Sequence, residues 1–152
     1  MIYSQIKYGL IIYGFTTKSN INKLQTLQNQ LLKVLTFKDR RYPTNDIHSQ
    51  LKILKIEDLF YQEKVSFVHN FINDKLPPTF QNYFTEFSLV HNIETRNKNY
   101  NFIIPHHKTN IGASTIKING AKIWNDLDAN IKQISDIKIF RNSIKEKFMP
   151  YP

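Results

Sequence analysis

Cysteine is absent from the 152-residue chain. This absence excludes disulfide bridges, zinc sites built on thiolates and a cysteine nucleophile, and it fits an intracellular protein. Glycine and proline are also scarce, with 4 and 6 residues, which excludes collagen-like sequence and extended linkers. No internal repeat or low-complexity tract divides the chain.

Long hydrophobic runs are absent as well. The longest apolar stretch, YGLIIYGF at residues 8–15, has eight residues, whereas a membrane-spanning helix needs about 20. The N-terminus lacks a basic region ahead of an apolar one, so it does not resemble a signal peptide. We therefore expect no membrane contact and an intracellular location, either cytoplasmic or nuclear.

Hydrophobic residues make up 41% of the chain and aromatic residues 13%, which is a globular composition. The length predicts a single domain over residues 1–152. We expect this domain to be mainly α, with an irregular, partly β segment around residues 95–120. Its parts are a helical half at 1–76, a loop-rich stretch with short β segments at 77–134, and a C-terminal helix at 135–148.

Helical periodicity is clearest in three segments. The first, NINKLQTLQNQLLKVLTF, should begin after Ser19 as N-cap and pack a face made by positions 21, 24, 27, 31 and 35. The second, IEDLFYQEKVSFVHNFIND, ends before the prolines at 77 and 78. The third, SDIKIFRNSIKEKF, should begin with Ser135 as N-cap.

Weaker patterns lie between these helices. Thr44 or Asn45 is expected to cap a short helix that runs through Leu51. The run YNFII at 100–104 is β-prone, and the proline that follows would stop it. The alternating stretch STIKING at 114–120 predicts a strand.

Acidic residues are missing from two long blocks. Residues 1–38 hold five lysines, residues 95–125 hold five basic residues, and neither block has an acid; the formal net charge of the chain is +9. Such blocks are typical of a surface that faces phosphates, although a lysine-rich composition by itself would also raise the charge. The candidate nucleic-acid-binding residues are Arg96, Lys98, Lys108, Lys117, Lys122, Lys23 and Lys33.

The stretch TRNKNYNF at 95–102 interleaves basic and aromatic residues. Arg96 and Lys98 could hold phosphates while Tyr100 or Phe102 stacks on a base. Alternatively, both aromatic rings pack inward and Arg96 closes the loop by donating to backbone carbonyls. The sequence leaves both interpretations open.

Patterns that would support catalysis are weak. Asp126 and Asp128 form a D-x-D pair that could hold a divalent cation or simply begin a turn. His106 and His107 could be metal ligands, but they need a third ligand, and exposed loop histidines are the plainer interpretation. No phosphate-binding glycine loop or nucleophile motif occurs. We expect no metal, no cofactor and no catalytic residue.

Seven short motifs follow one another in a specific order. They are IKYGLIIYG (6–14), LQTLQNQLLKVLT (24–36), LKILKIEDL (51–59), LPP (76–78), HNIETRN (91–97), NGAKIWNDL (119–127) and FRNSIKEKF (140–148). Together they resemble the region downstream of the palm in non-LTR retrotransposon reverse transcriptases of the jockey and CR1-like type. The resemblance covers roughly residues 3–148; each motif is weak alone, and their order makes the match specific.

The resemblance has departures. Tyr13 stands where the family often has tryptophan, and Asp128 stands where it usually has proline, which weakens the metal interpretation of the D-x-D pair. The aromatic-x-Asp-Asp polymerase motif, the other palm carboxylates and the endonuclease domain have no counterpart here. The resemblance therefore implies a truncated element copy or gene-model fragment, non-catalytic by itself, of an RNA-directed DNA polymerase.

The function that the resemblance implies is support: the chain would grip RNA or an RNA–DNA hybrid beside the missing palm and thumb. The alternative is a helical protein-interaction module whose exposed apolar faces once packed on those missing parts, without nucleic-acid binding. An unrecognised hydrolase is a third possibility, but no residue stands out as its nucleophile. The sequence does not indicate an oligomeric state.

The only tryptophan lies in GAKIWNDL, and three roles compete for this stretch: a carboxylate metal pair, a stacking platform for a base, or a packing anchor. The resemblance favours an anchor that holds residues 120–127 to the helical core, with Asn125 or a backbone carbonyl bonding the indole N–H. Trp124, Tyr13 and Leu31 are the predicted structural anchors.

Overall fold

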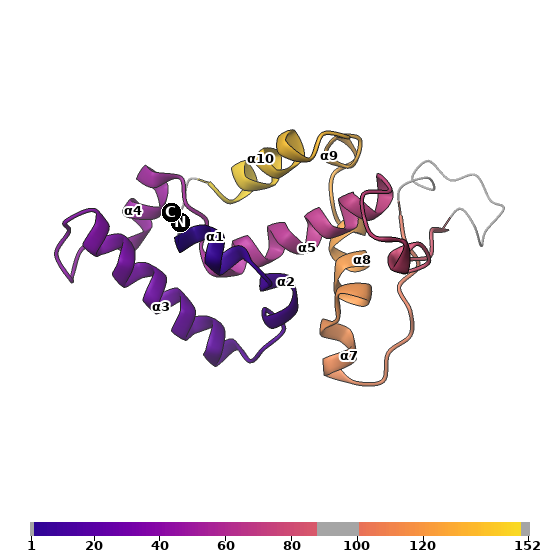
Figure 1. Ribbon diagram of the computed structural model, residues 1–152, viewed down its shortest axis with the longest axis horizontal. Coiled ribbons are helices and arrows are strands. Elements are labelled where there is room, and N and C mark those ends of the chain that lie inside the picture. Colours follow the sequence, from indigo (N-terminus) through magenta and orange to yellow (C-terminus); the bar gives the residue numbers. More distant parts are fainter. Residues whose placement is uncertain (1, 88–100, 150–152) are drawn as a thin grey trace. The chain divides into compact units, whose positions relative to one another are not determined.

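The computed structural model describes residues 2–87 and 101–149, with side chains from residue 4 onward (Figure 1). The described chain is mainly helical, as the sequence predicts. Its elements are α1 (Ile2–Lys7), α2 (Leu10–Tyr13), α3 (Lys18–Leu35), α4 (Thr44–Leu51), α5 (Ile56–Ile72), η1 (Pro78–Phe80), α7 (Asn110–Ser114), η3 (Ile116–Gly120), α8 (Ala121–Asn125), α9 (Ala129–Lys132) and α10 (Ile137–Phe148).

The chain forms two compact units. The first comprises Met1–Gln62 and Asn142–Pro152, and the second comprises Glu63–Arg141. The boundaries therefore fall within α5 and within α10. The expectation of one domain over the whole chain stays a prediction.

The core of the first unit joins the N-terminal helices to the start of α5. Leu10, Leu54, Ile56 and Leu59 are fully buried, and Ile21 from α3 packs with them. The glycine that follows α2 is required by this packing, because a Cβ at position 14 would collide with the ring of Phe60.

A buried polar network holds α3 to the connection between α4 and α5. The Gln25 amide oxygen accepts a hydrogen bond from the Ile56 N–H at 2.7 Å, and the Gln28 amide donates to the Leu54 carbonyl at 3.0 Å. Gln28 is only 4% exposed. These amides satisfy the first N–H of α5 and a carbonyl just before that helix, which would otherwise lie buried without partners.

This network makes the predicted face of α3 wrong in part. The structure buries positions 21, 28 and 32 and leaves Leu27 56% exposed, Leu31 37% exposed and Leu35 60% exposed. Leu31 is therefore not a core anchor. Tyr13 is 39% exposed, and its hydroxyl donates to the Ile6 carbonyl, so it ties α2 to α1 at the surface.

The helix starts differ from the predicted caps by one or two residues. Thr17, not Ser19, precedes α3, and Pro43 precedes α4, which therefore begins at the expected cap residue Thr44. Before α10 the cap is Asp136 instead of Ser135. Its carboxylate accepts hydrogen bonds from the N–H groups of Lys138 and Ile139 at 2.8 and 2.9 Å, and these bonds lower the pKa of Asp136.

Three helices end in left-handed residues that are not glycine. Phe37, Lys52 and Asp74 have φ of 52°, 51° and 53° and follow α3, α4 and α5. Each helix end carries the paired backbone hydrogen bonds of a Schellman motif, such as Lys75 N–H to the Asn70 carbonyl at 2.9 Å. The helix α5 therefore ends at Ile72 through its own backbone, before the prolines that the sequence suggested as the stop.

Aromatic rings dominate the core of the second unit. Phe67 of α5 makes edge-to-face contacts with Phe80, Tyr83 and Phe84, at centroid distances of 5.3, 5.9 and 6.3 Å. Phe102 is 3% exposed and packs against Phe84 at 5.1 Å.

The predicted β segments are wrong for the residues that the structure describes. An isolated antiparallel bridge joins Glu86 and Phe102, and the described part of 77–134 holds no longer strand. The stretch STIKING, predicted as a strand, forms the end of α7 and the π-helical turn η3. A strand needs a partner for its backbone groups, and a helical turn supplies these bonds locally. Residues 95–100 of the predicted segment lie outside the described residues.

Candidate nucleic-acid interface

The buried tryptophan of α8 packs that helix, which carries part of the candidate site, against the core of the second unit. Trp124 is fully buried, as predicted for an anchor. Its ring stacks on Phe140 of α10 at 5.9 Å, and Phe140 stacks on His69 of α5 at 4.3 Å. The three aromatic rings connect α8, α10 and α5 within the second unit, so α8 is held from its buried side.

Asn125, the residue after the tryptophan, binds the backbone of Phe102. The Asn125 amide nitrogen donates to the Phe102 carbonyl, and its amide oxygen accepts from the Phe102 N–H, both at 2.8 Å. This pair satisfies both backbone groups of one buried residue. The sequence suggested that Asn125 or a backbone carbonyl bonds the indole N–H; that partner stays a prediction, and the pairing of Asn125 with Phe102 was not expected from the sequence.

The turn η3 brings a lysine to the surface beside a tyrosine. Gly120, at its end, lies so close to α5 that a Cβ there would meet Val68 at 3.2 Å. On the exposed side, the Lys117 ammonium lies 5.8 Å from the ring centroid of Tyr83, within the range of a cation–π contact. Sequence reasoning did not select Tyr83, because it lies 34 residues from Lys117 along the chain.

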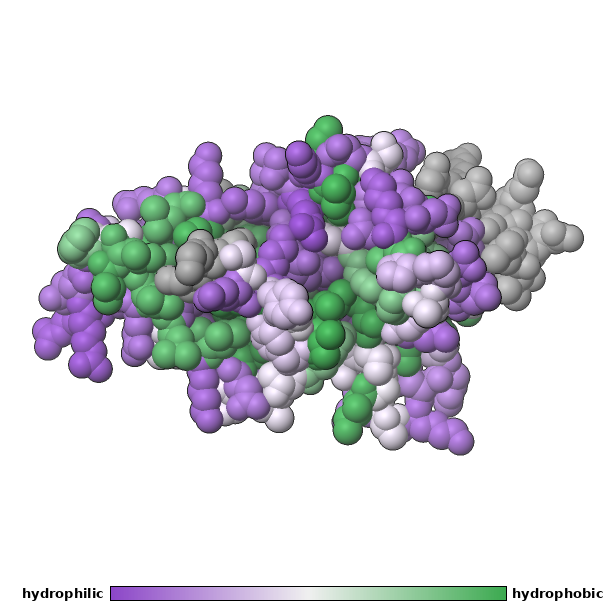
Figure 2. Space-filling view, viewed as in Figure 1, coloured by the Kyte–Doolittle hydropathy of each residue, from purple (hydrophilic) through white to green (hydrophobic). Residues whose placement is uncertain are grey.

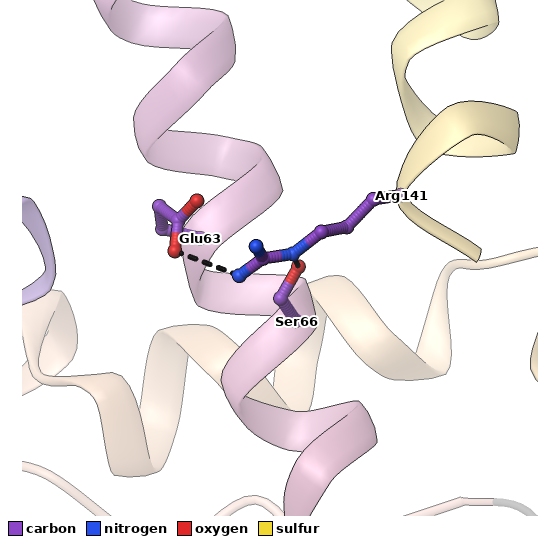
Figure 3. A network of polar contacts seen from close by, with 3 residues as sticks. All are labelled: Glu63, Ser66 and Arg141. Atoms are coloured by element: carbon purple, nitrogen blue, oxygen red, sulfur yellow. Dashed lines mark hydrogen bonds and ion pairs between the residues drawn. The ribbon is translucent and has the colours of Figure 1, made fainter. Parts of the chain in front are cut away.

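Several other cations of the second unit serve its own fold. Figure 3 shows Arg141 of α10 reaching two side chains of α5: it donates to the Glu63 carboxylate and to the Ser66 hydroxyl, each at 3.1 Å. Lys64 donates to the Asn119 amide oxygen at 2.7 Å, and burial lowers the pKa of Lys64 to about 8. These charges are positioned by internal acceptors and are poor candidates for contact with a phosphate.

Lys132 is another cation held by internal acceptors, and it accounts for the position of the D-x-D pair, Asp126 and Asp128. Its ammonium donates to the Asn101 amide oxygen at 3.0 Å and to the Asn125 carbonyl at 2.9 Å. Burial lowers the pKa of Lys132, and the nearby Asp126 and Asp128 act in the opposite direction. Both aspartates are exposed and flank the turn between α8 and α9. Their negative charges partly offset the cost of burying the Lys132 ammonium.

Three of the predicted binding residues lie exposed in the described part of the second acid-free block. They are Lys108, before α7, Lys117 in η3 and Lys122 in α8. Residues 101–125 contain no acidic residue. Arg96 and Lys98, predicted to bind with them, lie outside the described residues, and so does the choice between the two roles of Arg96.

The remaining two predicted residues belong to the first unit. Lys23 is exposed on α3. Lys33 is half-buried, and its ammonium donates to the Arg40 carbonyl at 2.6 Å, so it ties the end of α3 to the following loop. Of these two lysines, Lys23 is the better candidate for an external contact.

Within residues 2–87 and 101–149, no cluster of three or more histidine, aspartate or glutamate residues is arranged to hold a metal ion. His106 and His107 are exposed in the segment before α7. No helix of the described chain is both long and apolar enough to cross a membrane. No protein-family profile, curated protein or solved structure matches this chain.

Two buried histidines of the described residues, His48 and His69, predict that the protein loses stability in mild acid. Burial lowers the pKa of His48 and of His69 below 6.5, the value for an exposed histidine. Between the folded pKa and 6.5 the unfolded chain binds more protons, so stability is full above pH 6.5 and falls as the pH decreases. The expected slope is at most about 1.4 kcal/mol per pH unit for each histidine.

Urea unfolding at several pH values between 8 and 5.5 measures this effect. The His69→Phe variant keeps an aromatic ring against Phe140 and loses the bond from His69 Nε2 to the Ile134 carbonyl, 2.6 Å long. It should be less stable at pH 8, but its stability should depend less on pH. An unchanged pH dependence would show that His69 does not titrate in this range.

Proposed function

We propose that this chain is a non-catalytic support that binds RNA or an RNA–DNA hybrid through exposed lysines of its second unit. The resemblance to the C-terminal portion of non-LTR retrotransposon reverse transcriptases suggests this role. The observation that carries it is the exposure of Lys108, Lys117 and Lys122 along an acid-free segment. Lysines of this kind contact phosphates and release counterions.

The scaffold beneath these lysines supports the proposal. Lys122 and Lys117 lie on α8 and η3, which are held by the buried Trp124 and by the close approach of Gly120 to Val68. A fixed arrangement of charges lowers the entropy cost of binding. Half-buried Tyr83 packs against Phe67 and lies beneath the Lys117 ammonium, so it helps to position that charge. Contacts between these lysines and phosphates would give binding with little sequence preference.

The test is the salt dependence of binding to a single-stranded RNA. For the wild-type chain, log affinity should fall with log salt at a slope of about −2 to −4. Replacing Lys108, Lys117 and Lys122 together by glutamine should reduce that slope by about 2, since each phosphate contact on a single strand contributes about 0.7. The control replaces Lys75, Lys138 and Lys147, which are exposed outside the acid-free blocks.

The control variant loses the same charge, so it separates a local contact from the effect of net charge. The proposal requires the first variant to lose more affinity and more salt dependence than the control. Equal losses in both would indicate non-specific attraction by the overall charge. A flat salt response of the wild-type chain would favour the protein-interaction alternative.

A further inference from the structure

The exposed side of α3 carries an apolar stripe. Leu27, Leu31, Val34 and Leu35 are 56%, 37%, 72% and 60% exposed, and their spacing of four, three and one residues places them along one side of a helix. Phe37, just past the helix end, is 96% exposed. Figure 2 shows hydrophobic residues gathered at the surface in the region of α3 and α4. An apolar stripe of this length is uncommon on a monomer without a partner.

The stripe borders the face that holds α3 in the first unit, because partly buried Leu24 and buried Gln28 lie beside Leu31 and Leu35 around the helix. That buried face is formed by Ile21, Gln28 and Leu32, which lie about a quarter-turn around the helix from Leu31 and Leu27. Burial of α3 in its own core therefore does not require the exposed leucines. Their positions follow the alternating spacing of three and four residues that packs one helix along another.

The charged residues around the α3 stripe indicate which kind of partner would bind there. Lys23 lies four residues before Leu27 on α3. Lys38 follows the left-handed Phe37 just past the helix, and its ammonium lies 4.8 Å from the ring centroid of Tyr42. A basic residue therefore stands at each end of the stripe. Both are exposed, and residues 4–38 contain no acid. Asp39, Arg40 and Arg41 follow, and all three are exposed, so this end of the stripe adds two basic groups and one acid. A second copy of this face would bring lysine against lysine in antiparallel or parallel packing, which is unfavourable.

From this pattern we infer that the α3 stripe is a docking surface for an acidic amphipathic helix of another protein. The leucines and the valine receive the apolar side of that helix, in the helix-in-groove manner. Lys23 and Lys38 pair with glutamate or aspartate at its flanks, which sets its orientation and its rate of association. Nucleic acid does not explain the stripe, since aliphatic side chains offer bases no stacking face.

Two peptides of about three heptads provide the probe. Both carry leucine at their a and d positions; one carries glutamate at the flanking positions, and the other carries lysine. The glutamate peptide should bind the full chain, and Val34→Glu should weaken this binding roughly tenfold or more. The matched control is Ile111→Glu in the second unit, because Ile111 is 82% exposed. This substitution should leave the affinity for the peptide unchanged.

A charge swap makes the test specific. In the double variant Lys23→Glu/Lys38→Glu the preference should invert, so that the lysine peptide binds more tightly than the glutamate peptide. Melting curves establish that each variant is folded, which is expected because every replaced side chain is exposed. If the two peptides bind the wild-type chain equally, the inference is wrong.

Other occupants give different results. Self-association of the wild-type chain that Val34→Glu abolishes, measured by sedimentation, would assign the stripe to a second copy. Vesicles of phosphatidylcholine and phosphatidylserine that bind through Val34, when the glutamate peptide does not, would assign it to an anionic membrane surface. RNA binding that is lost in Val34→Glu would assign it to nucleic acid. Each of these outcomes would overturn the inference.

Discussion

Replacing Trp124 by alanine should destabilise the protein by about 3–5 kcal/mol. The indole is fully buried and stacks on Phe140, which in turn stacks on His69. Its removal leaves a cavity at the base of α8 and frees Phe140 from one side. The total stability of a domain of this size is about 5–15 kcal/mol, so the variant should melt far below the wild type or be insoluble.

Thermal melting and urea unfolding measure this loss. Ile111→Ala is the control, because it also truncates an apolar side chain of the second unit, and Ile111 is 82% exposed; its melting temperature should hardly change. Trp124→Phe should fall between the two, since it keeps an aromatic ring against Phe140. A Trp124→Ala protein that melts normally but no longer binds RNA would show that the tryptophan is a stacking platform, and the assignment as an anchor would be wrong.

Replacing Asn125 by aspartate should cost about 1–3 kcal/mol or more, although the two side chains have the same shape. The oxygen that accepts from the Phe102 N–H is kept. The amide nitrogen that donates to the Phe102 carbonyl becomes a carboxylate oxygen, so two acceptors face each other at a residue that is 3% exposed. The negative charge raises the cost further, because it is partly desolvated.

The pH dependence of the Asn125→Asp variant identifies the cause. Once protonated, the introduced carboxyl can donate to the Phe102 carbonyl, so its folded pKa should lie above its unfolded value. The destabilisation is then largest at neutral pH and decreases as the pH falls through that pKa. Asn130→Asp, at an exposed position of α9, is the isosteric control and should have little effect at any pH. A variant as stable at pH 7 as this control would contradict the hydrogen-bonded role of Asn125.

The local pattern of the sequence was sufficient to predict the long helices, whose apolar residues recur at helical spacing. The three long helices lie where apolar periodicity placed them, and α10 buries Phe140 and Ile144, which are four residues apart on one side of the helix. Trp124 is buried as the sequence indicated. These features were predictable because a large apolar side chain gains free energy on burial in almost any fold, and because helical spacing gathers such side chains on one face.

Which face of α3 turns inward was decided only by the tertiary structure. The sequence offers a leucine-rich side and a side that contains Gln25 and Gln28, and hydrophobicity favours the first. The fold buries the second, because the N–H of Ile56 and the carbonyl of Leu54 require partners that the two amides supply. Such a choice depends on backbone groups more than 20 residues away, which no local pattern contains.

For the candidate interface too, some features follow from the sequence and others only from the tertiary structure. The sequence alone determined its charge, since the absence of acid from residues 95–125 is a property of composition. It did not reveal that Lys64, Lys132 and Arg141 are occupied by internal acceptors. It also did not pair Lys117 with Tyr83 or Asn125 with Phe102. These relations join distant segments, and only the packing of the second unit brings their atoms within bonding distance.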